Sequence, residues 1–167
     1  MQIKIIAVGG TIDKVYFDQK SSYQVGEPLI KEILNEANVA FEFNWESILA
    51  KDSLDMTDED RDLIYEKVAL TGAERILITH GTDTMIQTAR RLMTIPAKTI
   101  VLTGAMQPAR FRHSDAVFNI GFAVAALQLL PHSVYIAMNG RIFHPEHVRK
   151  NIALSRFEPI EPEVKTI

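Results

Sequence analysis

Two threonine motifs lie about seventy residues apart in this chain, and each directly follows a run of residues typical of a β-strand. The first is Gly-Gly-Thr-Ile at residues 9–12, and the second is His-Gly-Thr-Asp-Thr at residues 80–84. In an open α/β sheet, ligands bind just beyond the carboxyl ends of the strands, so Thr11 and Thr82 are expected to face one crevice. A hydroxyl nucleophile beside a second hydroxyl with an acidic neighbour suits acyl transfer.

Both motifs also place backbone amides near the threonine hydroxyls. Gly10 permits a positive φ, so the turn can expose N–H groups together with Thr11. Thr82 and Asp83 are expected in the first turn of a helix, where free N–H groups favour an anionic substrate group or a developing oxyanion. Two plainer interpretations stay open: the first motif is a tight turn, and Thr82 and Asp83 only cap a helix.

Three residues outside the motifs could take part in the same chemistry. Tyr23 lies in the loop after Thr11 and can relay a proton if it reaches that hydroxyl, with Tyr16 as the competing residue. Ser53 could hold a carboxylate, although a polar turn before a helix explains it equally simply. Lys150 could act as a base near Thr82 if its pKa is lowered, but exposed lysines are usually only solvated.

The histidines do not predict a metal site. His144 and His147 are three residues apart, the other three are scattered, and no third ligand follows at a recognised spacing. We therefore expect neither a metal nor an organic cofactor.

Strand-like and helix-like segments alternate along the chain, which predicts a parallel sheet covered by helices on both faces. Thr57 is the expected N-cap of one helix, with Asp60 three residues on. Residues 13–25 are expected to form a mobile loop, and residues 139–167 to be irregular. The expected strands are 3–8, 39–45, 76–79, 99–102 and 133–138, and the expected helices are 29–37, 57–70, 82–93 and 114–130.

Length, net charge and composition exclude several classes of protein. A chain of 167 residues is expected to form one domain, and a net charge of −3 gives no basic footprint for nucleic acid. No apolar run reaches the roughly 18 residues of a membrane span, and no signal peptide is recognisable. There is no cysteine, hence no disulfide framework. We therefore expect a cytoplasmic protein that binds neither nucleic acid nor membrane.

With these residues in place, the chain resembles the N-terminal domain of the bacterial-type L-asparaginase family. The resemblance covers most of residues 1–155, in the order and spacing of the family's motifs. It implies a flavodoxin-like three-layer α/β sandwich with a mostly parallel sheet and no metal or organic cofactor. The matching stretches are Gly9-Gly10-Thr11-Ile12, Asp52-Ser53-Leu54-Asp55-Met56-Thr57, His80-Gly81-Thr82-Asp83-Thr84-Met85, Leu102-Thr103-Gly104-Ala105-Met106 with Pro108, and Ser114-Asp115 with Asn119.

The resemblance also implies roles for individual residues. The threonine that matches Thr11 is the family's nucleophile, and the loop tyrosine that Tyr23 resembles assists it. Residues matching Thr82, Asp83 and Lys150 form a second polar triad.

Substrate binding is implied by the same match. The residues that match Ser53 and Asp83 hold the α-carboxylate and α-amino groups of the substrate, and backbone N–H groups near Gly10 or Thr82 are expected to stabilise the oxyanion. The expected reaction is hydrolysis of the side-chain amide of L-asparagine to L-aspartate and ammonia through a threonine acyl-enzyme. Two alternatives stay open: an amidase for another amide such as glutamine, and an amino-acid sensor with little turnover.

Members of the family usually carry a second, smaller C-terminal domain, which this chain is expected to lack. We expect a catalytic domain over residues 1–155 and a short tail over 156–167. A domain without its partner domain should expose apolar surface, so a homo-oligomer, dimer or larger, is expected.

Overall fold

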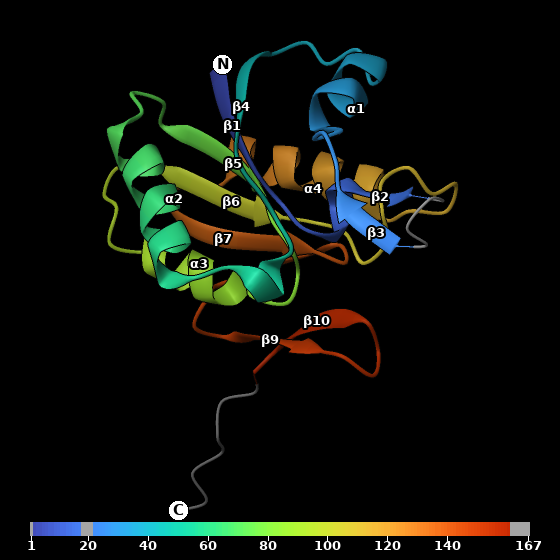
Figure 1. The fold of residues 1–167 in the computed structure, drawn as a ribbon. Helices are drawn as coiled ribbons and strands as arrows, with labels where there is room; N and C mark the ends of the chain where they lie inside the picture. Colours follow the sequence, from blue (N-terminus) through green and yellow to red (C-terminus); the bar gives the residue numbers. More distant parts are fainter. Residues whose placement is uncertain (1, 18–21, 161–167) are drawn as a thin grey trace, which may run out of the picture.

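A six-stranded sheet in the order β4-β1-β5-β6-β7-β8 forms the centre of the computed structural model, which describes residues 2–17 and 22–160 (Figure 1). The first five of these strands are parallel, and β8 pairs antiparallel with β7. Counted along the chain, the parallel strands follow the order 2-1-3-4-5, which is the flavodoxin-like order, so the predicted fold class is confirmed. The strands are β1 (Gln2–Gly9), β4 (Glu42–Lys51), β5 (Arg75–Thr79), β6 (Thr99–Thr103), β7 (Ser133–Met138) and β8 (Arg141–Phe143).

Helices cover both faces of the sheet (Figure 1). Side chains alternate between the faces along each strand, so Ile6 packs in one core and Ile5 in the other. Buried residues of α2 and α3 share the core of Ile6, whereas those of α1 and α4 share the core of Ile5. The helices are α1 (Ile30–Glu36), α2 (Asp58–Leu70), α3 (Met85–Leu92) and α4 (Ala116–Leu129). None of the helices among the described residues is long and apolar enough to cross a membrane.

The start of α2 is fixed by the capping box that the sequence predicts. The Thr57 hydroxyl accepts a hydrogen bond from the Asp60 amide at 3.3 Å, and the Asp60 carboxylate accepts one from the Thr57 amide at 2.9 Å. Lys51, the last residue of β4, forms an ion pair with Asp60 at 2.8 Å. The short segment between β4 and α2, which contains Ser53, is therefore held at both ends.

Two predictions of irregular structure are wrong. Residues 14–25 contain an antiparallel hairpin, β2 (Lys14–Phe17) and β3 (Ser22–Val25), and a second hairpin, β9 (Val148–Asn151) and β10 (Arg156–Pro159), follows β8. The second hairpin forms because Val148 and Phe157 bury their side chains in the core with Phe143. The expected domain boundary at residue 155 falls at the start of β10 and stays a prediction, since residues 161–167 lie outside the described part of the chain.

Two element boundaries also differ from expectation. The second strand was expected over 39–45, but the ladder with β1 runs from the pair Gln2–Glu42 to the pair Gly9–Lys51, so β4 lies further along the chain. Helix α3 begins at Met85, not in the turn of Thr82 and Asp83.

Candidate active site

The first threonine motif lies in a tight turn at the carboxyl end of β1. Thr11 begins a 3₁₀ helix, Thr11–Asp13, and its side chain is half-buried. Gly10, just before it, has φ 93° and ψ −174°, a conformation that is essentially restricted to glycine. The Gly10 amide donates to the carbonyl of Lys51 at 2.9 Å, which ties this turn to the end of β4.

Two glycines bring the threonine motifs into contact. A Cβ atom added to Gly10 would lie 2.3 Å from both the N and the Cα of Gly81, so the two backbones touch where any side chain would keep them apart. A Cβ on Gly81 would in turn lie 2.5 Å from the Cβ and the Oγ of Ser53. Three segments therefore meet at one point: the end of β1, the end of β5 and the turn after β4.

The second threonine belongs to a hydrogen-bonded group that the sequence predicts. Lys150 Nζ donates to Thr82 Oγ1 at 2.7 Å and to Asp83 Oδ1 at 2.7 Å. Thr82 is buried at 3 % exposure, and the Lys150 side chain is 17 % exposed. Lys150 reaches this position from β9, so the second hairpin supplies the cation of the site.

Thr82 and Asp83 lie in a turn before α3, not in its first turn as expected. The reason is that their side chains, and that of Thr84, are engaged elsewhere. Thr84, the N-cap residue, makes no side-chain cap and instead donates its hydroxyl hydrogen to the carbonyl of Ser53 at 2.8 Å. This bond joins the Ser53 turn to the second threonine motif.

Ser53 offers a buried hydroxyl that makes no hydrogen bond to the described residues. Its side chain is 1 % exposed and lies against Gly81. Buried hydroxyls nearly always have a partner, so the Ser53 hydroxyl has a hydrogen bond to offer that the described residues do not take up. The turn itself is held by Asp52, whose carboxylate accepts from the Leu54 amide at 3.1 Å and pairs with Lys14 at 2.5 Å.

The structure leaves the assisting tyrosine open. Tyr23 lies in β3 and pairs in register with Tyr16 of β2, so the two competing residues are cross-strand neighbours. Their side chains lie outside what the structure describes. The hairpin that carries both begins at Lys14, three residues after Thr11.

His80 was predicted only as part of the motif, and the structure gives it a positioning role. Its ring is fully buried, with Nδ1 2.8 Å from the Gly81 carbonyl oxygen and Nε2 2.8 Å from the Thr88 hydroxyl. Because a carbonyl only accepts, Nδ1 carries the hydrogen and Nε2 accepts from Thr88. Burial lowers the pKa of His80 to about 4, so the ring is neutral and fixes the Gly81 peptide beside Gly10.

The two motifs after β6 hold the loop that packs against His80. The Asp115 carboxylate accepts hydrogen bonds from the amides of Met106 and Gln107, and from the side-chain amide of Asn119 at 2.9 Å. Asn119 also donates to the Gly104 carbonyl at 3.0 Å. These bonds hold the loop after β6, in which Gly104 closely approaches the carbonyl of His80.

Asp13 is a buried acidic residue close to Thr11 in the chain that the sequence does not single out. It is 2 % exposed, its Oδ1 accepts from the Leu29 amide at 3.2 Å, and its Oδ2 has no hydrogen-bond partner among the described residues. Its backbone carbonyl accepts from Gly26 at 2.8 Å, so Asp13 joins both ends of the β2–β3 hairpin. Its position directly after the Gly-Gly-Thr-Ile motif was the only available signal, because residue type alone does not reveal burial.

The buried carboxyl of Asp13 predicts a pH-dependent stability. Burial raises the pKa of Asp13 from 3.8 to about 7, although the Leu29 amide opposes the shift. The folded protein therefore keeps a proton that the unfolded chain releases, so the stabilisation is complete below pH 3.8 and is lost as pH rises to about 7. At roughly 1.4 kcal/mol per pH unit, the loss amounts to at most about 4 kcal/mol.

Replacing Asp13 with Asn should remove this dependence. We expect Asp13→Asn to gain stability relative to the wild type between pH 5 and pH 8, on the order of 3 kcal/mol, in urea unfolding followed by circular dichroism. His80 titrates in both proteins and cancels in the difference. Asp55→Asn, an exposed change, is the control. Parallel stability curves for Asp13→Asn and the wild type would contradict the assignment of a proton to Asp13.

Comparison with known proteins agrees with this architecture. The family model "Asparaginase, N-terminal" matches residues 2–161. A probable periplasmic L-asparaginase of Haemophilus influenzae is 33 % identical over 164 residues, which are 89 % of this chain and 46 % of the relative. A glutaminase-asparaginase of Acinetobacter glutaminasificans is 30 % identical over 168 residues, 90 % of this chain and 50 % of the relative.

Solved structures give the same result. A probable cytoplasmic L-asparaginase from Campylobacter jejuni superimposes with a TM-score of 0.82 at 31 % identity, covering 95 % of this chain and 53 % of that one. The chain spans about half the length of the curated relatives that it matches. Its fold, its motifs and the family model agree over nearly its whole length, and the chain therefore belongs to the asparaginase family, as a match to that family's N-terminal domain.

Proposed function

We propose that this protein is an amidohydrolase that releases ammonia from the side-chain amide of L-asparagine through an acyl-enzyme on Thr11. The contact between Gly10 and Gly81 carries the proposal, because it forces both threonine loops into one site. Family membership supports the same class of reaction. No metal or organic cofactor takes part in the proposed reaction.

In the first half-reaction, the Thr11 hydroxyl attacks the amide carbonyl, and Tyr23 assists by taking the hydroxyl proton. Backbone N–H groups near Gly10 or Thr82 stabilise the oxyanion, each donor contributing about 3 kcal/mol. The C–N bond of the tetrahedral intermediate then breaks, the nitrogen takes the proton that Tyr23 relays from Thr11, and ammonia leaves an ester on Thr11. In the second half-reaction, water hydrolyses this ester and releases aspartate.

The Thr82 group organises the second half-reaction. In the observed geometry Lys150 is the donor to both Thr82 and Asp83, so it orients the Thr82 hydroxyl and offsets the Asp83 carboxylate. These three residues shuttle protons and position the water. Ser53 and Asp83 hold the α-carboxylate and α-amino groups, Ser53 through its unpaired hydroxyl.

Replacing Lys150 tests the role of this group. We expect Lys150→Met to lower kcat by about 10²- to 10³-fold, the usual contribution of a proton-transfer group. Arg149→Met is the matched control, because Arg149 precedes Lys150 on β9, is exposed and pairs with Glu158. The measurement is steady-state ammonia release, with melting temperatures for both variants. Equal activity of the two variants would remove Lys150 from the mechanism.

The direct test is coupled ammonia release from L-asparagine, L-glutamine and D-asparagine. The proposal predicts turnover of L-asparagine, with the acyl-enzyme trapped by hydroxylamine. A glutamine preference is the second candidate, since one relative is a glutaminase-asparaginase. If calorimetry detects binding of aspartate or asparagine but no ammonia is released from any of the three, the protein is an amino-acid sensor instead.

We also propose that the protein is a cytoplasmic homo-oligomer. Support for assembly comes from large apolar side chains exposed on α4, where Val117, Phe118 and Leu129 are 60 %, 61 % and 83 % exposed. Light scattering that finds a monomer at micromolar concentration would contradict assembly. The solved Campylobacter jejuni structure is titled cytoplasmic, whereas the Haemophilus influenzae relative is named periplasmic, so cell fractionation decides the location.

A further inference from the structure

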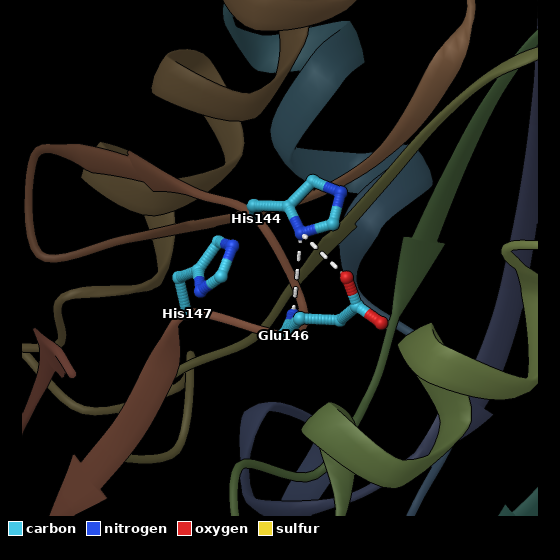
Figure 2. A group of neighbouring side chains, drawn as sticks. All are labelled: His144, Glu146 and His147. Carbon is cyan, nitrogen blue, oxygen red and sulfur yellow. Dashed lines mark hydrogen bonds and ion pairs between the residues drawn. The ribbon is translucent and has the colours of Figure 1, made fainter. Parts of the chain in front are cut away.

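Three potential metal ligands gather in the turn between β8 and β9. They are His144, Glu146 and His147, and one ligand atom from each lies within 4.8 Å of the other two. Figure 2 shows the side chains of His144 and Glu146 facing each other with His147 alongside. His144 Nδ1 is 3.9 Å from a carboxylate oxygen of Glu146, and the two imidazole centroids are 5.5 Å apart.

The backbone of this turn is held in place without a metal. The His147 amide donates to the His144 carbonyl at 3.0 Å, which closes a β-turn with Pro145 in the position where its fixed φ is favoured. Arg90 of α3 donates to the Pro145 carbonyl at 2.9 Å, and the Ile160 amide donates to the His147 carbonyl at 3.0 Å. The three candidate ligands therefore project from a fixed backbone, so little conformational entropy is lost when they bind an ion.

His144 Nδ1 and the Glu146 carboxylate direct lone pairs toward the same point. Its Nδ1 accepts from the Glu146 amide at 3.4 Å, so in that state the nitrogen carries a lone pair and no hydrogen. The same nitrogen faces the Glu146 carboxylate, which also offers only lone pairs. Both groups are partly exposed, and a metal ion placed between them would bind both lone pairs.

The spacing suits a metal ion. Zinc lies about 2.0–2.2 Å from imidazole nitrogen and carboxylate oxygen, so two tetrahedral ligands are about 3.3 Å apart. The 3.9 Å between His144 and Glu146 is close to this value. The other ligand atoms lie within 4.8 Å of one another and can approach further by rotation about side-chain bonds, because Glu146 and His147 are exposed.

We propose that His144, Glu146 and His147 bind one divalent transition-metal ion. Two imidazoles and one carboxylate suit zinc, nickel, cobalt or copper, whereas magnesium and calcium prefer oxygen ligands. The remaining coordination positions face solvent and take water. The ion joins the end of β8 to the start of β9, three residues before Lys150, so its binding stabilises the strand that presents Lys150 to Thr82.

The test uses untagged protein and measures binding of zinc by calorimetry and of cobalt by its visible absorption. We expect one ion per chain in the wild type, and at least about tenfold weaker binding in His144→Gln, His147→Gln and Glu146→Gln. His113→Gln and His132→Gln are the matched controls, because both residues are exposed histidines outside the turn. They should bind zinc as the wild type does, and zinc should raise the melting temperature of these two but not of His144→Gln.

Three results would overturn the proposal: no saturable zinc binding by the wild type, binding that the turn variants leave unchanged, or equal weakening in the His113 and His132 variants. Magnesium at the same concentrations is the specificity control and should leave the cobalt spectrum unchanged. Thr11 supplies no ligand to this site, so Thr11→Val should bind zinc normally whatever its activity.

Discussion

Thr11→Val should abolish ammonia release while leaving the fold intact. Valine keeps the shape of threonine but lacks the hydroxyl that attacks the amide, so we expect kcat to fall by at least about 10³-fold. Thr11 is half-buried in a short 3₁₀ helix, and its hydroxyl makes no hydrogen bond to the described residues that valine would remove. The measurement is initial-rate ammonia release, together with hydroxylamine trapping of the acyl-enzyme.

The control variants distinguish a threonine that forms the acyl-enzyme from one that only increases the rate. Thr94→Val changes an exposed threonine and should leave the rate unchanged. Thr82→Val should also be slow, but it should still form some acyl-enzyme, whereas Thr11→Val should form none. The reverse pattern would make Thr82 the nucleophile. A loss of only a few-fold in both variants would exclude a threonine acyl-enzyme altogether.

Gly10→Ala should destabilise the protein more than any other single methyl group added to the glycines of the site. The new Cβ would lie 2.3 Å from the N and Cα of Gly81, and backbone atoms cannot rotate away as a side chain can. The φ of 93° adds backbone strain of about 1–3 kcal/mol, and overpacking adds a similar amount. We therefore expect a loss of about 4 kcal/mol in the free energy of unfolding, measured in urea.

Gly121→Ala is the matched control for this change. Gly121 lies inside α4, and a Cβ there would meet nothing within 4 Å. Alanine is the better helix former by about 1 kcal/mol, so this variant should be more stable than the wild type. If Gly10→Ala lost less than about 1 kcal/mol, the two threonine loops would not be in the close contact described above.

Much of the parallel sheet is predictable because its strands carry a strong local pattern. Residues 133–138 are an apolar run bounded by Pro131 and Asn139, and β7 has those bounds. The Thr57 capping box is similarly local, since both of its partners lie within four residues. Such signals depend only on residues close together in the chain, so these elements can be predicted from the sequence.

The second hairpin was missed for the opposite reason. Its strands have four residues each, prolines and charged residues surround them, and burial in the core falls chiefly on Val148 and Phe157. No period emerges from so few residues. The contact of Gly10 with Gly81 was hidden for a related reason, because a glycine has no side chain from which its partner could be inferred.

Some site residues were likewise predictable from the sequence, and others were not. The pairing of Thr82, Asp83 and Lys150 appears in the structure where the family resemblance placed it, although Lys150 is 68 residues from Thr82 along the chain. By contrast, Asp13 is buried by contacts with Leu29, just before α1, and with Gly26, just after the first hairpin. Neither contact can be inferred from the residues next to Asp13 in the sequence.

The origin of Lys150 in the second hairpin has a consequence for biosynthesis. The ribosome makes the chain from its N-terminus, so Thr11, Ser53 and Thr82 and all five parallel strands emerge before β9. A nascent chain released before residue 150 would thus contain Thr11, the proposed nucleophile, and the parallel sheet but not the Lys150 ammonium group that donates to Thr82. For the reaction that we propose, the site is therefore complete only after the hairpin of β9 and β10 has docked onto a parallel sheet that is already synthesised.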